Sequence, residues 1–185
     1  NTADELRERM VAEIPSMRVG VSTDAGAHYG PVVTAQHRER VAGWIEKGVQ
    51  EGAELVVDGR DFSLQGHEKG YFIGPSLFDH VKPEMSSYQE EIFGPVLVII
   101  GYDDIDHAVD IANDSNFGLA GYVSGTDVDQ CRAVARRMRT GWISINGGFD
   151  FHAPFGGYKR SGNGREWGEH GFLEYLEVKS LLGYA

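Results

Sequence analysis

Cysteine is the rarest residue type in this 185-residue chain, which contains one, Cys131. A single thiol cannot form an internal disulfide framework, nor can it supply the thiolates of a zinc finger or an iron–sulfur cluster. The seven histidines are scattered from His28 to His170, and no two of them have the i, i+4 spacing of a metalloprotease helix. The sequence therefore predicts no metal site.

Long apolar runs and excess basic charge are also missing. No stretch approaches the roughly 20 residues that a membrane-spanning helix needs. The chain has 17 lysines and arginines against 28 acidic residues, a formal net charge of −11. Because such a surface repels phosphate backbones, we expect neither a nucleic-acid nor a membrane partner. No signal peptide is visible and the cytoplasm is the default expectation, although a chain that opens with Asn1 rather than Met says nothing about targeting.

What the chain does contain is enough apolar material for a core. Hydrophobic residues make up 41% and aromatic residues 11%, which excludes a disordered tail. The length suits one sizeable domain or two small ones. A chain of this size is expected to bury roughly 70% of its unfolded surface.

The periodicity predicts alternating helices and strands. In the first half, helices are expected at residues 2–14 and 35–51, with short strands at 53–58 and 76–78. Residues 95–101 form an unbroken apolar run, typical of a strand covered on both faces. A helix after Asp104, a strand at 119–124, a helix at 127–139 and a strand at 141–146 follow. The order predicts an α/β fold: an open, mostly parallel sheet with flanking helices.

Two features that imitate catalytic motifs have simpler explanations. Cys131 lies on the apolar stripe of its predicted helix, so we expect it to pack rather than react. The glycines of residues 161–168 resemble a dinucleotide-binding turn. They lack the preceding apolar strand and the later acidic residue that such a turn requires, which leaves a close-packing loop as the better interpretation.

The hexapeptide Glu90-Glu91-Ile92-Phe93-Gly94-Pro95 is the most informative motif. An ionised carboxylate only accepts hydrogen bonds, which suits it to hold two sugar hydroxyls. Solvated acids before a strand are the competing interpretation, which sequence physics alone favours.

This hexapeptide resembles the glutamate–phenylalanine motif of the aldehyde dehydrogenase superfamily. Further segments resemble that family in the same order along the chain. They are Gly70-Tyr71-Phe72-Ile73 with Pro75, Asn116-Phe117-Gly118-Leu119-Ala120-Gly121, Asn146, Pro154-Phe155-Gly156-Gly157-Tyr158-Lys159, Ser161-Gly162-Asn163-Gly164-Arg165-Glu166 and Glu177-Val178-Lys179. The resemblance runs from end to end.

The resemblance implies a cysteine-thioester oxidation of an aldehyde to an acid, or to an acyl-CoA, with NAD or NADP as cofactor. By the family's order, the nucleophile would fall shortly before Thr2 and the general base further upstream, so no catalytic residue is expected here. Cys131 comes well after the glutamate motif and does not inherit the role. We expect the isolated chain to be inactive.

The family's roles transfer to few positions. Glu91 would accept hydrogen bonds from the nicotinamide-side ribose, and Phe93 would border the nicotinamide ring. Phe155 would line the aldehyde tunnel, with Phe149 and Phe151 as weaker candidates because that loop varies in length.

The resemblance also implies a domain division and an assembly. Residues 1–174 would be the C-terminal portion of a catalytic domain, and residues 175–185 a terminal strand that joins copies into a homo-oligomer. Two other functions stay open. One is a non-catalytic interaction module that adds residues 177–182 to a neighbour's sheet; the other is an independent dinucleotide binder that uses residues 162–168.

Overall fold

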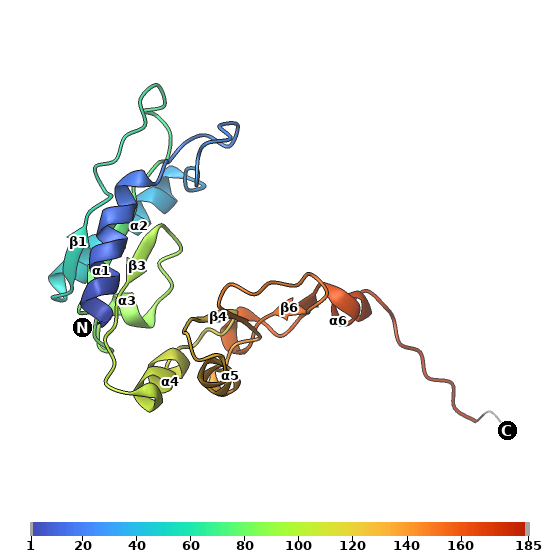
Figure 1. The fold of residues 1–185 in the computed structure, drawn as a ribbon. Coiled ribbons are helices and arrows are strands. Elements are labelled where there is room, and N and C mark those ends of the chain that lie inside the picture. The colour runs from blue at the N-terminus through green and yellow to red at the C-terminus, as the bar shows by residue number, and fades with distance from the viewer. Residues whose placement is uncertain (1, 184–185) are drawn as a thin grey trace. The chain divides into compact units, whose positions relative to one another are not determined.

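The computed structural model describes residues 2–183, which group into two compact units (Figure 1). The first unit ends at Gly101 and the second begins at Tyr102. In this described part, no helix is both long enough and apolar enough to cross a membrane. The division at residue 174 that the resemblance implies stays a prediction.

The first unit is built on a three-stranded sheet in the order β1-β2-β3. Strand β1 (Glu54–Val57) pairs antiparallel with β2 (Ser76–Asp79), and β2 pairs parallel with β3 (Val96–Val98). All four residues of β2 are buried, as the middle position in the sheet requires. The predicted strands at 53–58 and 76–78 are confirmed.

Helix α2 (Ala35–Gln50) supplies the other half of this core. Val41 and Ile45 of the helix and Phe78 of β2 are each 0% exposed and belong to one cluster. Gly48 leaves room for the Phe78 ring, because a Cβ there would lie 2.8 Å from the ring's Cζ. The helix begins as predicted at Thr34, whose side-chain oxygen accepts a hydrogen bond from the His37 N–H at 3.1 Å.

Strand β3 differs from the expectation that both its faces are covered. Val96, Val98 and Ile100 pack against the core, whereas Leu97, on the opposite face, is 50% exposed. Side chains alternate along a strand, so Leu97 faces away from the core, and the described residues cover the following Ile99, at 8% exposure, but not Leu97.

The first helix of the unit, α1 (Thr2–Glu13), is followed by the 3-10 turn η1 (Ile14–Ser16). Thr2 lies inside the helix. None of the α1 residues is buried, and Leu6 is 52% exposed. The apolar face that the periodicity predicts is therefore present but only partly covered, since Met10 is half-buried. A short helix, α3 (Ser86–Gln89), comes just before the glutamate motif.

The second unit begins with α4 (Ile105–Asn113), β4 (Ala120–Val123), α5 (Val128–Arg137) and β5 (Trp142–Ile145). Strands β4 and β5 pair in parallel, with Ala120 opposite Trp142 and Val123 opposite Ile145. Asp104 and Asp127 cap the two helices through side-chain oxygens that accept backbone N–H groups. The α/β class and the crossover between parallel strands are confirmed, with the strands arranged in small sheets.

The glycine-rich end of the unit forms an antiparallel pair, β6 (Phe155–Gly156) with β7 (Arg165–Glu166), around the turn η2 (Lys159–Ser161). Helix α6 (Gly168–Leu173) follows. Residues 176–183 form no helix or strand and are exposed. A strand needs a partner edge for its backbone groups, so pairing of this segment with another chain stays a prediction.

Candidate functional site

The turn that carries the glutamate–phenylalanine motif lies against helix α2. A Cβ at Gly94 would come within 2.8 Å of both Val41 methyl groups, so only glycine allows the backbone to approach the helix this closely. Ile92 is buried at 8% exposure and belongs to the core cluster. The motif is therefore anchored on both sides of Phe93.

Phe93 points its ring into solvent. Its backbone is left-handed with φ +57°, and its side chain is 65% exposed. The Phe93 carbonyl accepts a hydrogen bond from His37 Nε2 at 2.8 Å, and the two rings lie 6.0 Å apart. A strained backbone persists only where its surroundings hold it, and such positions are frequent at functional sites. The surrounding structure therefore holds the Phe93 ring in a solvent-exposed position.

Glu91 is exposed and borders an open depression of about 570 Å³. The other residues around it are Arg40, Gly43, Trp44, Lys47 and Glu90. Within residues 2–183, its carboxylate has no hydrogen-bond or ion-pair partner, which leaves both oxygens free to accept. A second depression of about 380 Å³ contains Phe93 and shares Arg40 with the first. Glu91 and Phe93 therefore border two hollows that share a residue.

The second unit brings the three candidate tunnel residues together. Phe149 and Phe151 lie edge to face with ring centroids 4.7 Å apart. Trp167 contacts Phe149 at 5.8 Å, Phe151 at 5.3 Å and Phe155 at 5.0 Å. Trp142 contacts Phe149 and Phe155 at 6.0 and 6.2 Å. We call these five rings the aromatic cluster.

Sequence reasoning missed the two tryptophans of the cluster. Trp167 directly follows β7, whose Glu166 pairs with Phe155, and Trp142 opens β5. No local pattern placed these indoles beside the loop, because their positions depend on the β6–β7 and β4–β5 pairings. Phe155 also borders a depression of about 370 Å³, of which neither Phe149 nor Phe151 is a lining residue in the described part of the chain.

Cys131 is buried as we expected, and Asn146 makes structural hydrogen bonds. Cys131 is 5% exposed in α5. The Asn146 side chain makes two hydrogen bonds to one residue: its Oδ1 accepts from the Gly125 N–H and its Nδ2 donates to the Gly125 carbonyl, both at 2.9 Å. These bonds join the end of β5 to the loop after β4.

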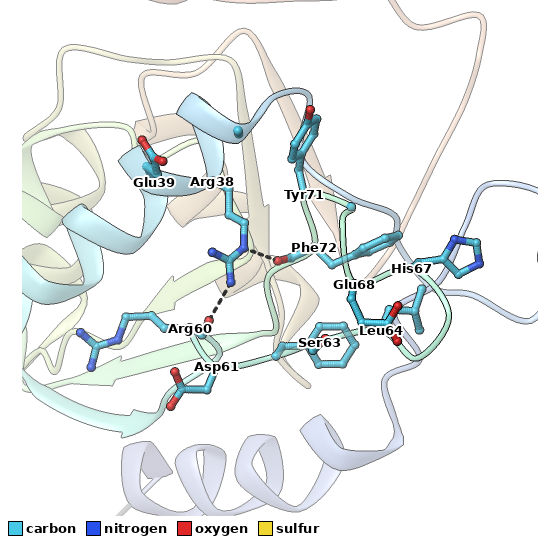
Figure 2. Close-up of a pocket in the computed structure, with 13 residues that line it drawn as sticks. Arg38, Glu39, Arg60, Asp61, Ser63, Leu64, His67, Glu68, Tyr71 and Phe72 are labelled. Carbon is cyan, nitrogen blue, oxygen red and sulfur yellow. Dashed lines mark hydrogen bonds between the residues drawn. The ribbon is translucent and has the colours of Figure 1, made fainter.

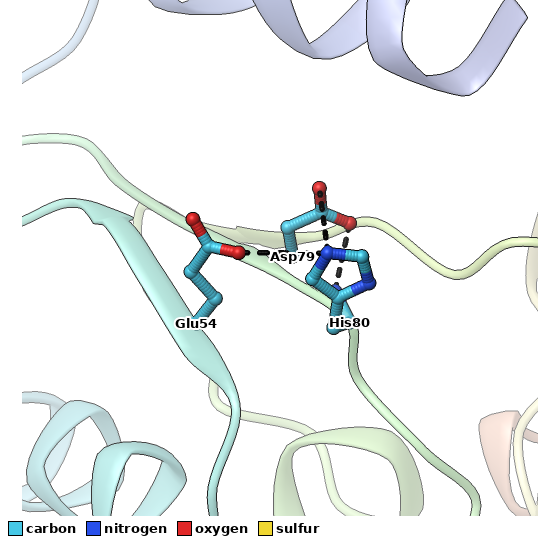
Figure 3. Close-up of side chains that lie close together, drawn as sticks. All are labelled: Glu54, Asp79 and His80. Atoms are coloured by element: carbon cyan, nitrogen blue, oxygen red, sulfur yellow. Dashed lines mark hydrogen bonds and ion pairs between the residues drawn. The ribbon is translucent and has the colours of Figure 1, made fainter. Parts of the chain in front are cut away.

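Glu54, Asp79 and His80 form a group whose ligand atoms all lie within 4.8 Å of one another (Figure 3). Glu54 and Asp79 are opposite each other in the β1–β2 register, which places two like charges side by side. Arg7 of α1 supplies the balancing cation, with Nη1 at 3.4 Å from Asp79 Oδ2 and 3.8 Å from Glu54 Oε1. The group is explained as an ion-pair cluster.

A polar hollow of about 460 Å³ lies beside the loop between β1 and β2 (Figure 2). Arg38 of α2 reaches across it and donates to the carbonyls of Phe72 and Arg60 at 2.7 and 3.1 Å. Hydrogen bonds from Arg60 in turn hold the pKa of Asp58 and of Glu46 below their ordinary values. The charged groups of this hollow therefore hold the loop in place.

Comparison with known proteins places these motifs in one family. Residues 1–181 match the aldehyde dehydrogenase family. A relative from Staphylococcus saprophyticus that is named as an aldehyde dehydrogenase is 47% identical over 169 residues, which are 91% of this chain and 35% of that protein.

Solved structures agree with this match. Aldehyde dehydrogenase C from Pseudomonas syringae, a mutant crystallised with NAD⁺ and octanal, is 43% identical with a TM-score of 0.89, over 99% of this chain and 38% of that chain. An aldehyde dehydrogenase from Mycobacterium tuberculosis crystallised with NAD⁺ is 42% identical with a TM-score of 0.87, over the same two shares. The chain spans less than two fifths of the length of these relatives, and it belongs to the aldehyde dehydrogenase family.

Proposed function

We propose that this chain is the part of an NAD(P)-dependent aldehyde dehydrogenase that holds the nicotinamide ribose and lines the aldehyde tunnel. The nucleophilic cysteine and the general base would belong to another part of the enzyme. The observation that carries the proposal is the Glu91 carboxylate, exposed and without a partner among residues 2–183, beside a turn that the core anchors.

The residues present fit the nucleotide cofactor. Two free carboxylate oxygens can accept from the two hydroxyls of a ribose. The exposed ring of Phe93, fixed by its left-handed backbone and by His37, offers a flat face to a flat ring. Glu91 and Phe93 would hold and orient the cofactor, which would supply the hydride acceptor for aldehyde oxidation. The relatives crystallised with NAD⁺ make NAD the first cofactor to test.

An apolar aldehyde is the proposed substrate class. Phe149, Phe151 and Phe155 offer rings without hydrogen-bonding groups, and two of them are more than half exposed. The Pseudomonas syringae relative was crystallised with octanal, which supports an aldehyde of medium length as the first probe. Release of the acyl group by water or by coenzyme A stays open.

The isolated chain is proposed to be inactive. Cys131 is its one thiol, and it is 5% exposed on the apolar stripe of α5. A buried thiol in apolar surroundings is a poor nucleophile. Purified chain with octanal and NAD should therefore produce no NADH, and measurable production would contradict this point.

The ribose contact is tested in a chimera. Residues 1–181 replace the matching portion of the Pseudomonas syringae enzyme, and NADH production from octanal is followed by absorbance. Glu91→Gln should raise the KM for NAD about tenfold, because a charge-assisted hydrogen bond becomes a neutral one. The KM for octanal should stay within twofold.

The matched control is Glu90→Gln, which removes the neighbouring exposed carboxylate and should leave the KM for NAD within twofold. Gel filtration and a thermal melt establish that each variant is folded. Equal effects of the two substitutions would refute the assignment of Glu91, and a folded but inactive chimera would refute the proposed function as a whole.

A second role, in assembly, is supported by the apolar side chains near the end of the chain. Tyr175, Val178, Leu181 and Leu182 are 82, 95, 79 and 94% exposed. We propose that residues 175–185 pair with another copy of the chain as a strand. Deletion of the residues after Tyr175 should reduce the oligomer size measured by light scattering, and an unchanged size would contradict the proposal.

The independent dinucleotide binder is tested by calorimetric titration of the chain alone with NAD. We expect no micromolar binding, because residues 162–168 lack the strand–turn–helix context of a dinucleotide site. Micromolar affinity that survives Glu91→Gln would favour the glycine-rich loop instead.

A further inference from the structure

We infer that Trp167 is a positioning residue for substrate selectivity: it holds Phe149, Phe151 and Phe155 in one arrangement and thereby favours long aldehydes over short ones. The inference rests on the proposed function, because it takes the three phenylalanines as tunnel residues. Trp167 itself borders none of the hollows described above. It acts through the rings that it contacts.

The backbone fixes the position of Trp167 from both sides. The residue before it, Glu166, pairs with Phe155 across the β6–β7 ladder. At the residue after it, Gly168, a Cβ would lie 2.2 Å from the His152 carbonyl oxygen, so the two backbones touch. Trp167 is therefore fastened both to the strand that bears Phe155 and to the loop that bears Phe149 and Phe151.

The rings make Trp167 the centre of this arrangement. It is the residue of the aromatic cluster that contacts all three phenylalanines, with centroid distances from 5.0 to 5.8 Å. The contacts with Phe149 and Phe151 are edge-to-face, at interplanar angles of 68° and 66°. Edge-to-face contacts at these distances are attractive and depend on orientation, so one indole fixes the planes of its neighbours.

Trp167 is less exposed than the phenylalanine rings that it contacts. Trp167 is half-buried, whereas Phe149 and Phe151 are 56 and 67% exposed. The phenylalanines thus offer apolar area to a ligand, and the tryptophan lies behind them. A loop of two exposed rings without such support would sample several rotamers, and a ligand would have to order them on binding.

The backbone of Trp167 is strained in a way that agrees with a held position. Its φ and ψ are +63° and +157°, a backbone conformation that residues other than glycine rarely adopt. Such strain persists where the surrounding structure determines the residue's place, and it is found most often at functional sites. The β6–β7 ladder, the Gly168 contact and three ring contacts supply that determination here.

The effect on selectivity follows from the apolar area that each substrate covers. A long alkyl chain reaches the phenylalanine rings and gains from a fixed apolar wall, whereas a short aldehyde gains little from it. A difference of a few methylene groups in an apolar pocket is worth roughly tenfold or more in selectivity. Loss of the support should therefore lower turnover of long aldehydes selectively.

The test uses the chimera that carries residues 1–181, with octanal and propanal as substrates. Trp167→Leu should lower kcat/KM for octanal about tenfold, mainly through KM, and change that for propanal by less than twofold. The KM for NAD should not change. Trp167→Phe, which keeps an aromatic ring, should restore at least half of the lost selectivity. Phe117→Leu is the matched control: Phe117 is an aromatic residue of the same unit, stacked with Arg160 and outside the cluster.

If Trp167 had a structural role alone, Trp167→Leu would lower kcat/KM for both substrates alike and lower the melting temperature. An unchanged ratio of kcat/KM for octanal to kcat/KM for propanal would overturn the inference. A second measurement uses the full 185-residue chain. Trp167→Leu should speed amide hydrogen exchange at residues 149–153 at least tenfold and leave residues 58–74 unchanged; unchanged exchange at 149–153 would also overturn it. The Trp167 inference fails on these readouts even when the chimera is active, which separates it from failure of the proposed function.

Discussion

The first unit buries aliphatic side chains, whereas the second buries mainly glycine backbone. Fully buried Val41, Ile45 and Leu77 represent a large apolar core in the first unit. In the described part of the second unit, the buried apolar side chains are Val109 and Cys131. Its other buried positions are Ser144 and five glycines: Gly118, Gly121, Gly156, Gly157 and Gly171.

This difference separates two ways of holding a loop that carries candidate site residues. The turn at Phe93 is fixed by side chains, because Ile92 enters the core and Gly94 lies on Val41. The loop at Phe149 is fixed by backbone contacts and ring edges, through Gly168 and Trp167. A substitution that removes side-chain volume should therefore harm the first unit most, and one that adds volume at a glycine should harm the second most.

The largest expected effect is that of Phe78→Ala in the first unit. Phe78 is 0% exposed and packs against helix α2, including Gly48. Its removal therefore leaves a cavity that the sheet cannot close. We expect a loss of about 3–5 kcal/mol in the free energy of unfolding, measured by urea titration with circular dichroism. Tyr102→Ala, at a 62% exposed position outside the proposed assembly strand, is the control and should change stability by less than about 0.5 kcal/mol. A loss for Phe78→Ala no larger than the control's would show that the first unit is not held by this core.

The next largest effect is expected from a substitution that adds side-chain volume at a glycine of the second unit. A Cβ at Gly141 would lie 2.0 Å from the Gly156 carbonyl oxygen, so Gly141→Ala must push β5 away from β6. We expect a loss of about 1–3 kcal/mol, together with faster hydrogen exchange in β5 and β6. The matched control is Gly43→Ala in α2, where the added Cβ meets nothing within 4 Å and alanine's helix propensity should add up to about 1 kcal/mol. Equal effects of the two alanines would remove the distinction between the units.

The sequence was sufficient where local rules decide the outcome. The caps at Thr34, Asp104 and Asp127, the parallel β4–β5 pair and the exposure of Glu90 and Glu91 all follow from spacing and residue type. Physics alone favoured solvated acids at Glu91, and the ribose-binding role that the family resemblance implies for it stays a prediction.

Other features depend on contacts between distant residues. Nothing near Leu97 in the sequence tells that one face of β3 stays open, since coverage depends on which elements pack there. The role of Trp167 was hidden for the same reason: it depends on the β6–β7 pairing and on the approach of Gly168 to His152. The left-handed backbone at Phe93 and Trp167 runs against residue preference, so propensity could not indicate it.

The smallest expected effect concerns acid stability, and it again distinguishes the units. In the first unit, hydrogen bonds from Arg60 lower the pKa of Asp58 and of Glu46, and hydrogen bonds from Ser86 lower the pKa of Glu51. In the second unit, the pKa of Asp150 is lowered by the backbone N–H and side chain of His152, two residues away. The Arg60–Glu46 and Ser86–Glu51 bonds join distant parts of the chain and are lost on unfolding. The Arg60–Asp58 and His152–Asp150 bonds are local contacts between residues two positions apart.

The direction of these pKa shifts determines how the stability of the fold changes with pH. The ordinary pKa values are 3.8 for Asp58 and 4.5 for Glu46. A carboxyl whose pKa is lower in the folded state stabilises the fold fully at pH values above its ordinary pKa. It loses this contribution as the pH falls through the folded pKa. Urea midpoints of the first unit should therefore decline from about pH 5 downward. Arg60→Met should lower the midpoint at neutral pH slightly, because these exposed pairs are screened by solvent, and should flatten the decline so that variant and wild type converge in acid. Ser86→Ala, which acts on Glu51 alone, is the control that keeps the Arg60-dependent part of the slope. Parallel pH curves for Arg60→Met and wild type would show that the loop between β1 and β2 is not held by this ion-pair group.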